Sequence, residues 1–274
     1  MKKIFLTLTV TLLAILAASD QNMPALLIPT DAQSMSMAAS TLALEPSAKL
    51  DAEAFWGKWA PSTFDDMMAG LDARIKLGGK FALTLDGTLF RDRPYDVTTA
   101  EGKVKGSFTP SEMIIGIGGD FKAAEFLSVE LKAKMFSSTL SEDVKSSAFG
   151  ADLIVRYLGK GFNLAAGVCN IGTSSMPMMA KVGGCYGVAG FTATAEADYL
   201  FSGALMAGLG LQYSIKDIVT LRAGYHYGDA EKALPSFVSA GLGVKLSGVK
   251  LDFAYVLANS NIAGSLMLGL GYSF

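Results

Sequence analysis

Hydrophobic and polar residues alternate along most of the chain after about residue 49. Successive side chains of a β-strand point to opposite faces, so alternation predicts strands with one apolar and one polar face. We find about fourteen such segments, and charges almost never fall on the apolar face. The segments run near 49–57, 66–77, 80–90, 111–122, 125–137, 146–157, 161–170, 180–188, 190–200, 204–214, 217–228, 237–247, 249–258 and 265–274.

The connections between these segments also alternate in length. Those after even-numbered segments are tight, as at Gly78-Gly79 and Ser247-Gly248, whereas most after odd-numbered segments are longer, as at 91–110 and 228–236. Short turns on one side and longer loops on the other are typical of a transmembrane barrel whose ends share one side. We therefore predict an all-β fold, a transmembrane antiparallel β-barrel of about 14 strands. The alternative, a soluble sandwich or lipocalin-like barrel, would point its apolar faces inward.

Both ends of the chain fit an exported barrel. Lys2 and Lys3 precede an apolar run that ends near Ala18, so we expect a cleaved signal peptide over residues 1–19. The run is shorter than the ~20 residues that a membrane-spanning helix needs. The last strand ends on Phe274 and resembles the strand that bacterial outer-membrane barrels present to their assembly machinery. We expect a bacterial outer-membrane location, contact with outer-membrane lipid, and that machinery as a partner.

Composition supports a barrel and excludes some partners. Hydrophobic residues make up 51% of the chain, with 30 Gly and 8 Pro, and the mean hydropathy is +0.38. Beyond the signal, no stretch approaches eighteen consecutive apolar residues, so the apolarity is spread over alternating strands. The net charge of −2 offers no basic surface for nucleic acid, which we do not expect as a partner.

The segment between the signal peptide and the first strand has a different character. Residues 24–48 are rich in Ala, Met and Leu but do not alternate, so they fit neither a solvated tail nor a strand. We predict that residues 20–48 form an N-terminal hatch that enters the barrel. Residues 49–274 then form the barrel itself, with no linker that would divide it.

The faces predicted to point inward carry balanced charge and glycine. Opposite charges in a lumen usually pair across strands, so an ion-paired wall is one interpretation and a selective binding site is the other. Glycines along the same faces leave room for a close approach to the wall. The lumen-facing binding candidates are Asp72, Arg74, Glu130, Lys132, Arg156, Arg222 and His226.

Catalytic and metal-binding signals are weak. The chain has one histidine, His226, near the outer end of its strand and close to Asp229, with no accompanying nucleophile motif. There is no P-loop, no HExxH motif and no cluster with metal-ligand spacing. We therefore predict a protein that is not an enzyme, with no metal and no cofactor.

Two cysteines lie on consecutive predicted strands. By the alternation, Cys169 and Cys185 both point inward, and pairing them would centre the hairpin at residue 177. A disulfide needs Cα atoms within about 7 Å, and a register slip of two residues would prevent it. The sequence leaves both a disulfide and two free inward thiols open.

Several stretches resemble the PorV/PorQ family, a group of FadL-like outer-membrane barrels of the Bacteroidota. They are residues 27–39, 219–229, 235–245 and the closing 270–274. The resemblance implies a fourteen-stranded barrel with an N-terminal hatch, and an association with type IX secretion components or secreted clients. The chain departs from the FadL-like pattern before the first strand, where it has Glu45-Pro46-Ser47-Ala48 in place of an Asn-Pro-Ala-like motif.

Three functions follow as hypotheses. The resemblance favours an accessory or client-carrying protein of type IX secretion, for which we expect a closed lumen and a flat outer rim. The first alternative is a FadL-like channel for hydrophobic small molecules, for which we expect a continuous apolar track from the outer rim through the hatch, or an opening in the lateral wall. The second is a structural barrel without selective transport.

Overall fold

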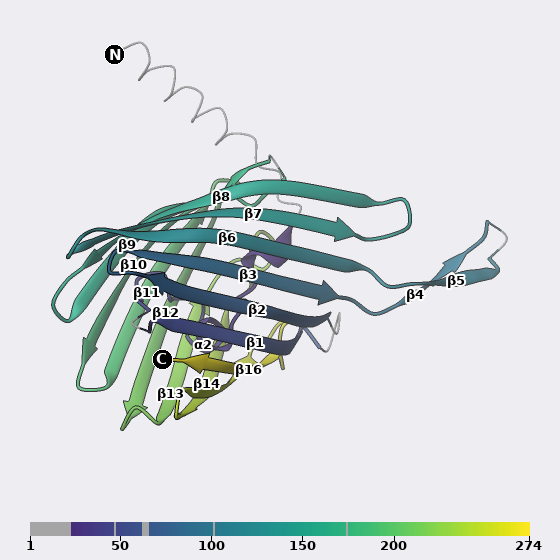
Figure 1. Ribbon diagram of the computed structural model, residues 1–274. Helices are drawn as coiled ribbons and strands as arrows, with labels where there is room; N and C mark the ends of the chain where they lie inside the picture. The colour runs from purple at the N-terminus through teal and green to yellow at the C-terminus, as the bar shows by residue number, and fades with distance from the viewer. Residues whose placement is uncertain (1–22, 47, 62–65, 101, 174) are drawn as a thin grey trace, which may run out of the picture.

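The chain forms a closed antiparallel β-barrel of fourteen strands, which confirms the predicted fold class (Figure 1). The computed structural model describes residues 23–46, 48–61, 66–100, 102–173 and 175–274, so the signal peptide expected over 1–19 lies outside the described residues. Within these ranges, no helix is long and apolar enough to cross a membrane.

The barrel strands follow one another around the wall in chain order, except that a separate hairpin interrupts them after β3. Before the barrel come a 3₁₀-helix, η1 (Pro24–Leu27), and a short helix, α2 (Ala32–Ser36). The barrel strands are β1 (Leu50–Trp59), β2 (Asp66–Leu77), β3 (Phe81–Arg91), β6 (Ser111–Ala124), β7 (Leu127–Thr139), β8 (Lys145–Leu158), β9 (Phe162–Gly172), β10 (Met179–Val188), β11 (Phe191–Leu200), β12 (Ala204–Ile215), β13 (Val219–Tyr227), β14 (Phe237–Leu246), β15 (Val249–Leu257) and β16 (Leu266–Ser273).

The last strand closes the barrel against the first. Asp51 of β1 lies opposite Ser273 of β16, and Lys58 lies opposite Leu266. Each end of β1 therefore has hydrogen-bonding partners on both sides, from β16 and from β2. Closure removes the exposed strand edges that an open sheet would present.

The two rims of the barrel differ, as the loop lengths predicted. The turn rim carries the tight connections, the start of β1 at Leu50 and the end of β16 at Ser273. Ala189-Gly190 and Ser247-Gly248 make two of its turns, and all four residues have positive φ angles. The loop rim carries most of the longer connections, including those between β13 and β14 and between β15 and β16.

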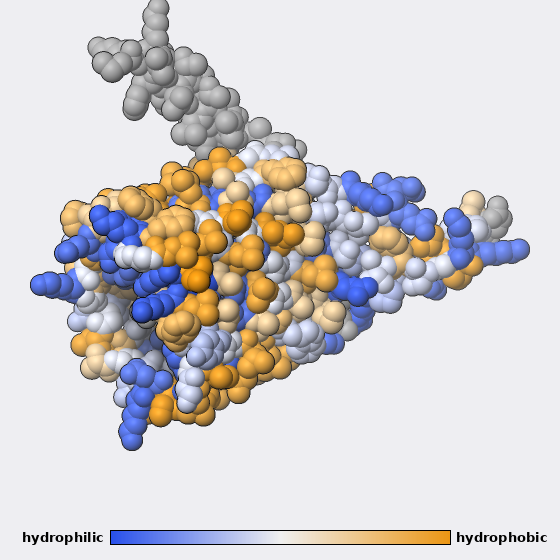
Figure 2. Space-filling view, in the orientation of Figure 1, coloured by the Kyte–Doolittle hydropathy of each residue, from blue (hydrophilic) through white to orange (hydrophobic). Residues whose placement is uncertain are grey.

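Apolar side chains cover the outside of the wall. Leu71, Leu131 and Leu209 are typical, with 47%, 60% and 59% of their surface exposed. Figure 2 shows hydrophobic residues over the middle of the visible face and hydrophilic ones gathered toward its ends. The aromatic residues predicted to lie on this face are all exposed, namely Phe81, Phe121, Phe149, Tyr157, Phe162, Tyr186, Phe191, Tyr199, Tyr213, Tyr225, Tyr227, Tyr255 and Tyr272.

The connection between β3 and β6, expected as a loop over 91–110, contains a hairpin. Strands β4 (Tyr95–Thr98) and β5 (Val104–Phe108) pair with each other and not with the barrel. The hairpin projects well beyond the loop rim (Figure 1). At its base, the Tyr95 hydroxyl donates a hydrogen bond to the carbonyl oxygen of Leu140, 3.0 Å away.

Candidate functional site

The lumen is divided into a polar half near the turn rim and an apolar half near the loop rim. Strand β1 shows the change along its inward face, which runs Asp51, Glu53, Phe55, Gly57 and Trp59 from the turn rim upward. Other strands repeat it, so the loop-rim half is packed with large apolar side chains. Besides Phe55 and Trp59, these include Met68, Phe90, Ile114, Phe136, Met206, Phe237, Val256 and Met267, all buried.

This apolar half differs from the sequence prediction, which lined the whole lumen with charge and glycine. The prediction describes the turn-rim half best; near the loop rim, the buried Asp198 of β11 and its ion-pair partner Lys181 of β10 are charged exceptions to the apolar lining. The loops complete the apolar half, because Met176, Met178, Leu234 and Ile262 of the loop-rim connections are also buried. Methionine adapts its shape to irregular gaps and varied ligands, so the packing here is well suited to change when a small molecule enters.

The N-terminal segment, residues 23–46, packs against the inner wall. Helix α2 contacts β13, β14, β15 and β16. Glycines on these strands and on β12 let the segment approach closely: a Cβ atom added at Gly224 would lie 2.7 Å from the Ala38 nitrogen, and one at Gly208 would lie 2.6 Å from the Ala38 oxygen. Asp31 begins α2 as its N-cap and accepts a hydrogen bond from the Ser34 amide at 2.6 Å.

Charged side chains of the wall hold the N-terminal segment at Leu42, six residues after α2 ends. The carboxylate of Glu196 accepts a hydrogen bond from the Leu42 amide at 2.9 Å, and the Arg156 guanidinium donates to the Leu42 carbonyl at 2.8 Å. Lys181 lies 2.7 Å from Glu196 and 3.3 Å from Asp198, so its charge is balanced by two carboxylates. Both backbone polar groups of Leu42 are thus satisfied inside the lumen.

Further polar contacts extend the anchor along the segment. The Ser239 hydroxyl donates to the Ser36 carbonyl at 3.0 Å, and the hydroxyls of Ser40 and Thr194 lie 2.7 Å apart. Asn163 donates to the carbonyl of Ala43 at 3.2 Å. These three contacts come from β9, β11 and β14.

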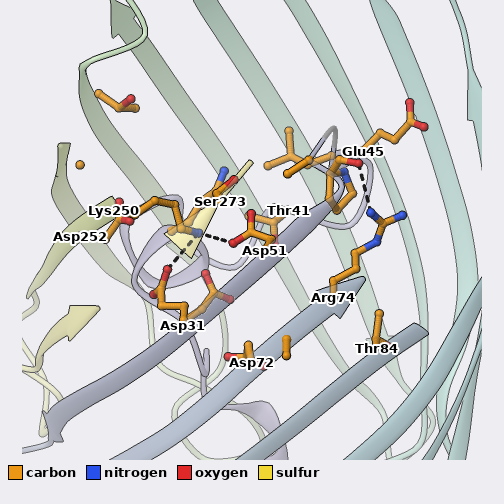
Figure 3. Close-up of a pocket in the computed structure, with 18 of the residues that line it drawn as sticks. Asp31, Thr41, Glu45, Asp51, Asp72, Arg74, Thr84, Lys250, Asp252 and Ser273 are labelled. Carbon is orange, nitrogen blue, oxygen red and sulfur yellow. Dashed lines mark hydrogen bonds and ion pairs between the residues drawn. The ribbon is translucent and has the colours of Figure 1, made fainter. Parts of the chain in front are cut away.

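The turn-rim half of the lumen encloses a cavity of about 870 Å³. Its walls are the N-terminal segment between Asp31 and Ala48 and every barrel strand except β9 and β10, with Asp31, Asp51, Asp72 and Lys250 pointing into it (Figure 3). Six of the seven sequence-predicted candidates line this cavity. They are Asp72, Arg74, Glu130, Lys132, Arg156 and Arg222.

Most of these charges are paired across strands. Arg156 lies 2.8 Å from Glu130 and 3.5 Å from Asp120, and Arg222 pairs with Asp252 at 2.5 Å. Burial raises the pKa of the Asp31 carboxyl above its usual value, against the opposing effects of the Ser34 amide and the nearby cations. The cavity is thus an ion-paired chamber with carboxylates in excess, because ten acidic and six basic residues line it.

The seventh candidate, His226, lies elsewhere. It is buried in the apolar half, its ring stacked on Phe237 with centroids 4.8 Å apart. Its Nδ1 lies 3.4 Å from the carbonyl oxygen of Ala38, so this nitrogen donates and the ring helps to hold the segment. Asp229 accepts a hydrogen bond from the Glu231 amide within the loop that follows β13. In the described part of the chain, no three His, Cys, Asp or Glu residues are placed to hold a metal ion.

The disulfide that the sequence left open is not formed. Cys169 and Cys185 are both free thiols. Cys169 lies opposite Met179 and Cys185 lies opposite Asn163, so the hairpin is centred three residues earlier than a disulfide requires. Six residues along a strand separate the thiols by about 20 Å. Cys185 instead contacts the Ala43 carbonyl at 3.4 Å.

Comparison with solved structures identifies the fold. No family model matches the chain, and no curated protein matches it in sequence. The toluene transporter TbuX of Ralstonia pickettii superposes with a TM-score of 0.61 at 11% identity, covering 94% of this chain and 99% of its own. The chain shares the β-barrel fold of this transporter.

A second toluene transporter, TodX of Pseudomonas putida, superposes on this chain with a TM-score of 0.56 at 14% identity. The alignment covers 94% of this chain and 95% of TodX. A TodX variant described as a monoaromatic hydrocarbon channel gives a TM-score of 0.54 at 14% identity, covering 85% and 92% of the two chains. At these identities the likeness concerns the fold.

Proposed function

We propose that the protein is an outer-membrane channel for small hydrophobic molecules and not an enzyme. The observation that carries this proposal is the apolar half of the lumen. A channel for hydrophilic solutes has a polar, water-filled interior, whereas here Phe55, Trp59, Phe136 and Phe237 fill the space behind the loop rim. Such a lining favours an apolar solute over a charged one.

The exterior supports a place in the membrane. Apolar residues form the outer surface of the strands, and aromatic residues lie toward both ends, where amphipathic rings prefer the headgroup region. With short turns at the periplasmic side, the turn rim and its cavity face the periplasm, and the loop rim faces outward. A solute would then enter among the methionines of the loop rim and leave past the N-terminal segment.

The structural relatives support the same class of solute. TbuX and TodX are described as toluene transporters. Toluene is a small aromatic hydrocarbon, and the apolar half of this lumen offers aromatic and thioether side chains of the kind that contact such rings.

An accessory role in type IX secretion, implied by the resemblance to the PorV/PorQ family, stays a prediction. It expected a closed lumen, which the packed loop-rim half fits, and a flat outer rim, from which the β4–β5 hairpin departs by projecting outward (Figure 1). Secreted clients and secretion components are therefore weaker candidates as partners than a hydrophobic solute.

The two tryptophans provide a direct test of binding in the lumen. Trp59 is 5% exposed and faces inward, whereas Trp56 is 40% exposed on the lipid side. Trp56→Phe leaves Trp59 as the single reporter, and Trp59→Phe leaves Trp56 as the matched control. We expect 4-nitrotoluene, an apolar aromatic quencher, to quench Trp59 fluorescence to saturation in lipid nanodiscs, and toluene to relieve the quenching.

Partitioning of the quencher into lipid would affect both variants. Trp56 should therefore show only a linear, non-saturating decrease that toluene does not reverse. Equal linear curves for the two variants would contradict a binding site in the apolar half, and with it the proposed channel.

A further inference from the structure

The lipid-facing side of the barrel strands is almost free of charge. In the strand residues that the structure describes, the only charged ones on this side are Lys58, Arg91 and Lys145. All three are cations, and each lies at the loop-rim end of its strand. A charged side chain is costly at the middle of the bilayer but is tolerated near the headgroups, so these positions mark the edge of the apolar band.

Two of these cations belong to one row of residues that lie directly opposite one another on neighbouring strands. Arg91 of β3 is opposite Ser111 of β6. Ser111 is opposite Thr139 of β7, and Thr139 is opposite Lys145 of β8. Neighbouring strands lie ~4.8 Å apart, so the Cα atoms of Arg91 and Lys145 are about 15 Å apart. Two long cationic side chains thus flank two hydroxyl groups, and we call these four residues the outer polar patch.

The patch lies where the apolar surface of the wall ends. Two residues closer to the turn rim, the row is Leu89, Met113, Ser137 and Ser147, and two residues further on it is Gly87, Ile115, Met135 and Phe149. Ile115 and Phe149 are 39% and 62% exposed. Figure 2 shows hydrophilic residues at this end of the wall, beyond its hydrophobic middle. The surface therefore changes from apolar through hydroxyl-bearing to cationic, as the membrane changes from acyl chains to headgroups.

The side chains of the patch have no partner within the described part of the protein. None of the four makes a side-chain hydrogen bond or an ion pair there. The two cations are exposed, and the two hydroxyl residues are partly exposed. The neighbouring acidic residues make no ion pair with the patch: Asp92 accepts a hydrogen bond from the Arg93 amide at 2.6 Å, and Glu142 and Asp143 lie in the loop beyond the strand ends. The patch is therefore open to a partner from outside the chain.

On the opposite side of the barrel, the lipid-facing residues at the loop-rim ends of the described strands are uncharged. Those of β11 to β15 are all exposed, namely Tyr199, Leu205, Tyr227, Val238 and Leu257. Aromatic and aliphatic ends of this kind anchor a barrel in any lipid, because they present no charge to the headgroups. The cations are confined to the sector from β1 to β8, as a localised partner requires, and are not spread around the rim as general anchors would be.

We infer that the outer polar patch binds an anionic lipid whose headgroup ends in a phosphate group. Arginine and lysine both pair with phosphate oxygens, and the hydroxyl groups between them add hydrogen bonds. The acyl chains then lie against the apolar row beneath, at Ile115 and Phe149. Because the loop rim faces outward, the lipid belongs to the outer leaflet. The inference rests on the membrane location and orientation proposed above, and it holds whichever solute crosses the lumen.

Native mass spectrometry of the purified full-length protein in a neutral detergent tests this site. Three lipids with identical acyl chains separate the headgroup from the chains: phosphatidic acid, phosphatidylcholine and diacylglycerol. We expect phosphatidic acid to stay bound and the two lipids without net charge to bind about twentyfold more weakly, since each of two cations at a membrane surface contributes about fivefold. Arg91→Gln and Lys145→Gln should therefore each lower the preference about fivefold, and the double variant should abolish it.

Conservative and matched variants separate this site from general attraction to charge. Arg91→Lys and Lys145→Arg keep the charges and should keep most of the preference. Lys216→Gln and Lys232→Gln remove exposed cations from a turn and from another loop, and should leave it unchanged. Each variant is checked for folding by its heat-modifiable mobility on gels. Equal binding of the three lipids, a preference that survives the double variant, an equal loss in the matched variants, or displacement of the lipid by inorganic phosphate at equal concentration would overturn the proposal.

Discussion

At the residue scale, the inward faces of the strands were predictable only where they carry charge or glycine. Asp72 and Arg74 were assigned to the lumen because they alternate with apolar neighbours. Near the loop rim, apolar and polar residues no longer alternate, because the inward and the outward residue of each pair are both apolar. Met67-Met68, Leu89-Phe90 and Met135-Phe136 each have one member in lipid and one in the lumen. Adjacent apolar pairs at strand ends are therefore the sequence feature from which the apolar half of the lumen could be predicted.

The anchor at Glu196 predicts a large local energetic effect. Its carboxylate holds both the Leu42 amide and the buried Lys181 ammonium. Glu196→Ala leaves Lys181 with Asp198 alone, so we expect a loss of about 3 kcal/mol in the free energy of unfolding, measured by urea titration in lipid vesicles. Glu231→Gln, on the exposed loop after β13, should change it by less than about 0.5 kcal/mol. Similar values for the two variants would contradict the anchoring role.

At the element scale, the strands and turns follow from alternation, whereas the hatch and the hairpin do not. Residues 24–48 were predicted to enter the barrel from their apolar, non-alternating composition, but nothing in that composition specifies helix α2 or its cap at Asp31. The β4–β5 hairpin was hidden because its nine strand residues mix polar and apolar types irregularly. Glycines on β12, β13 and β14 were recognised as room for a close approach, and the segment occupies that room.

The fit between the segment and this glycine wall can be tested with one methyl group. Gly224→Ala places a Cβ within 2.8 Å of three atoms of Met37 and Ala38, so the segment must shift. We expect faster hydrogen exchange at the amides of residues 37–40 and a loss of about 1–3 kcal/mol of stability. Gly87→Ala is the matched control, because the nearest atom to its added Cβ is 4.0 Å away. Unchanged exchange in Gly224→Ala would show that the segment does not depend on the wall.

At the scale of the whole molecule, the barrel lumen has two chemically different halves, one packed with apolar side chains and one enclosing an ion-paired cavity. The apolar half lies behind the loop rim, and the ion-paired cavity opens toward the turn rim. The N-terminal segment lies along one wall between them, held by side chains of β8, β9, β11, β13 and β14. Fold class and strand order could be predicted, since they depend on local alternation. The separation of the lumen into a polar and an apolar half could not be predicted, because it depends on which strand ends come together when the barrel closes.

The placement of the segment predicts how the closed barrel can be opened. Deleting residues 24–44, while keeping the signal expected over 1–19, removes the helices and the chain at Leu42 that fill part of the lumen. We expect single-channel conductance in planar bilayers to rise clearly above that of the intact protein, because ions then meet fewer side chains between the rims. Deleting 95–108, the β4–β5 hairpin, removes a shorter segment from outside the barrel and should leave conductance unchanged. If the two deletions gave the same conductance as the intact chain, the segment would not be a plug, and the packed apolar side chains of the loop rim alone would close the lumen.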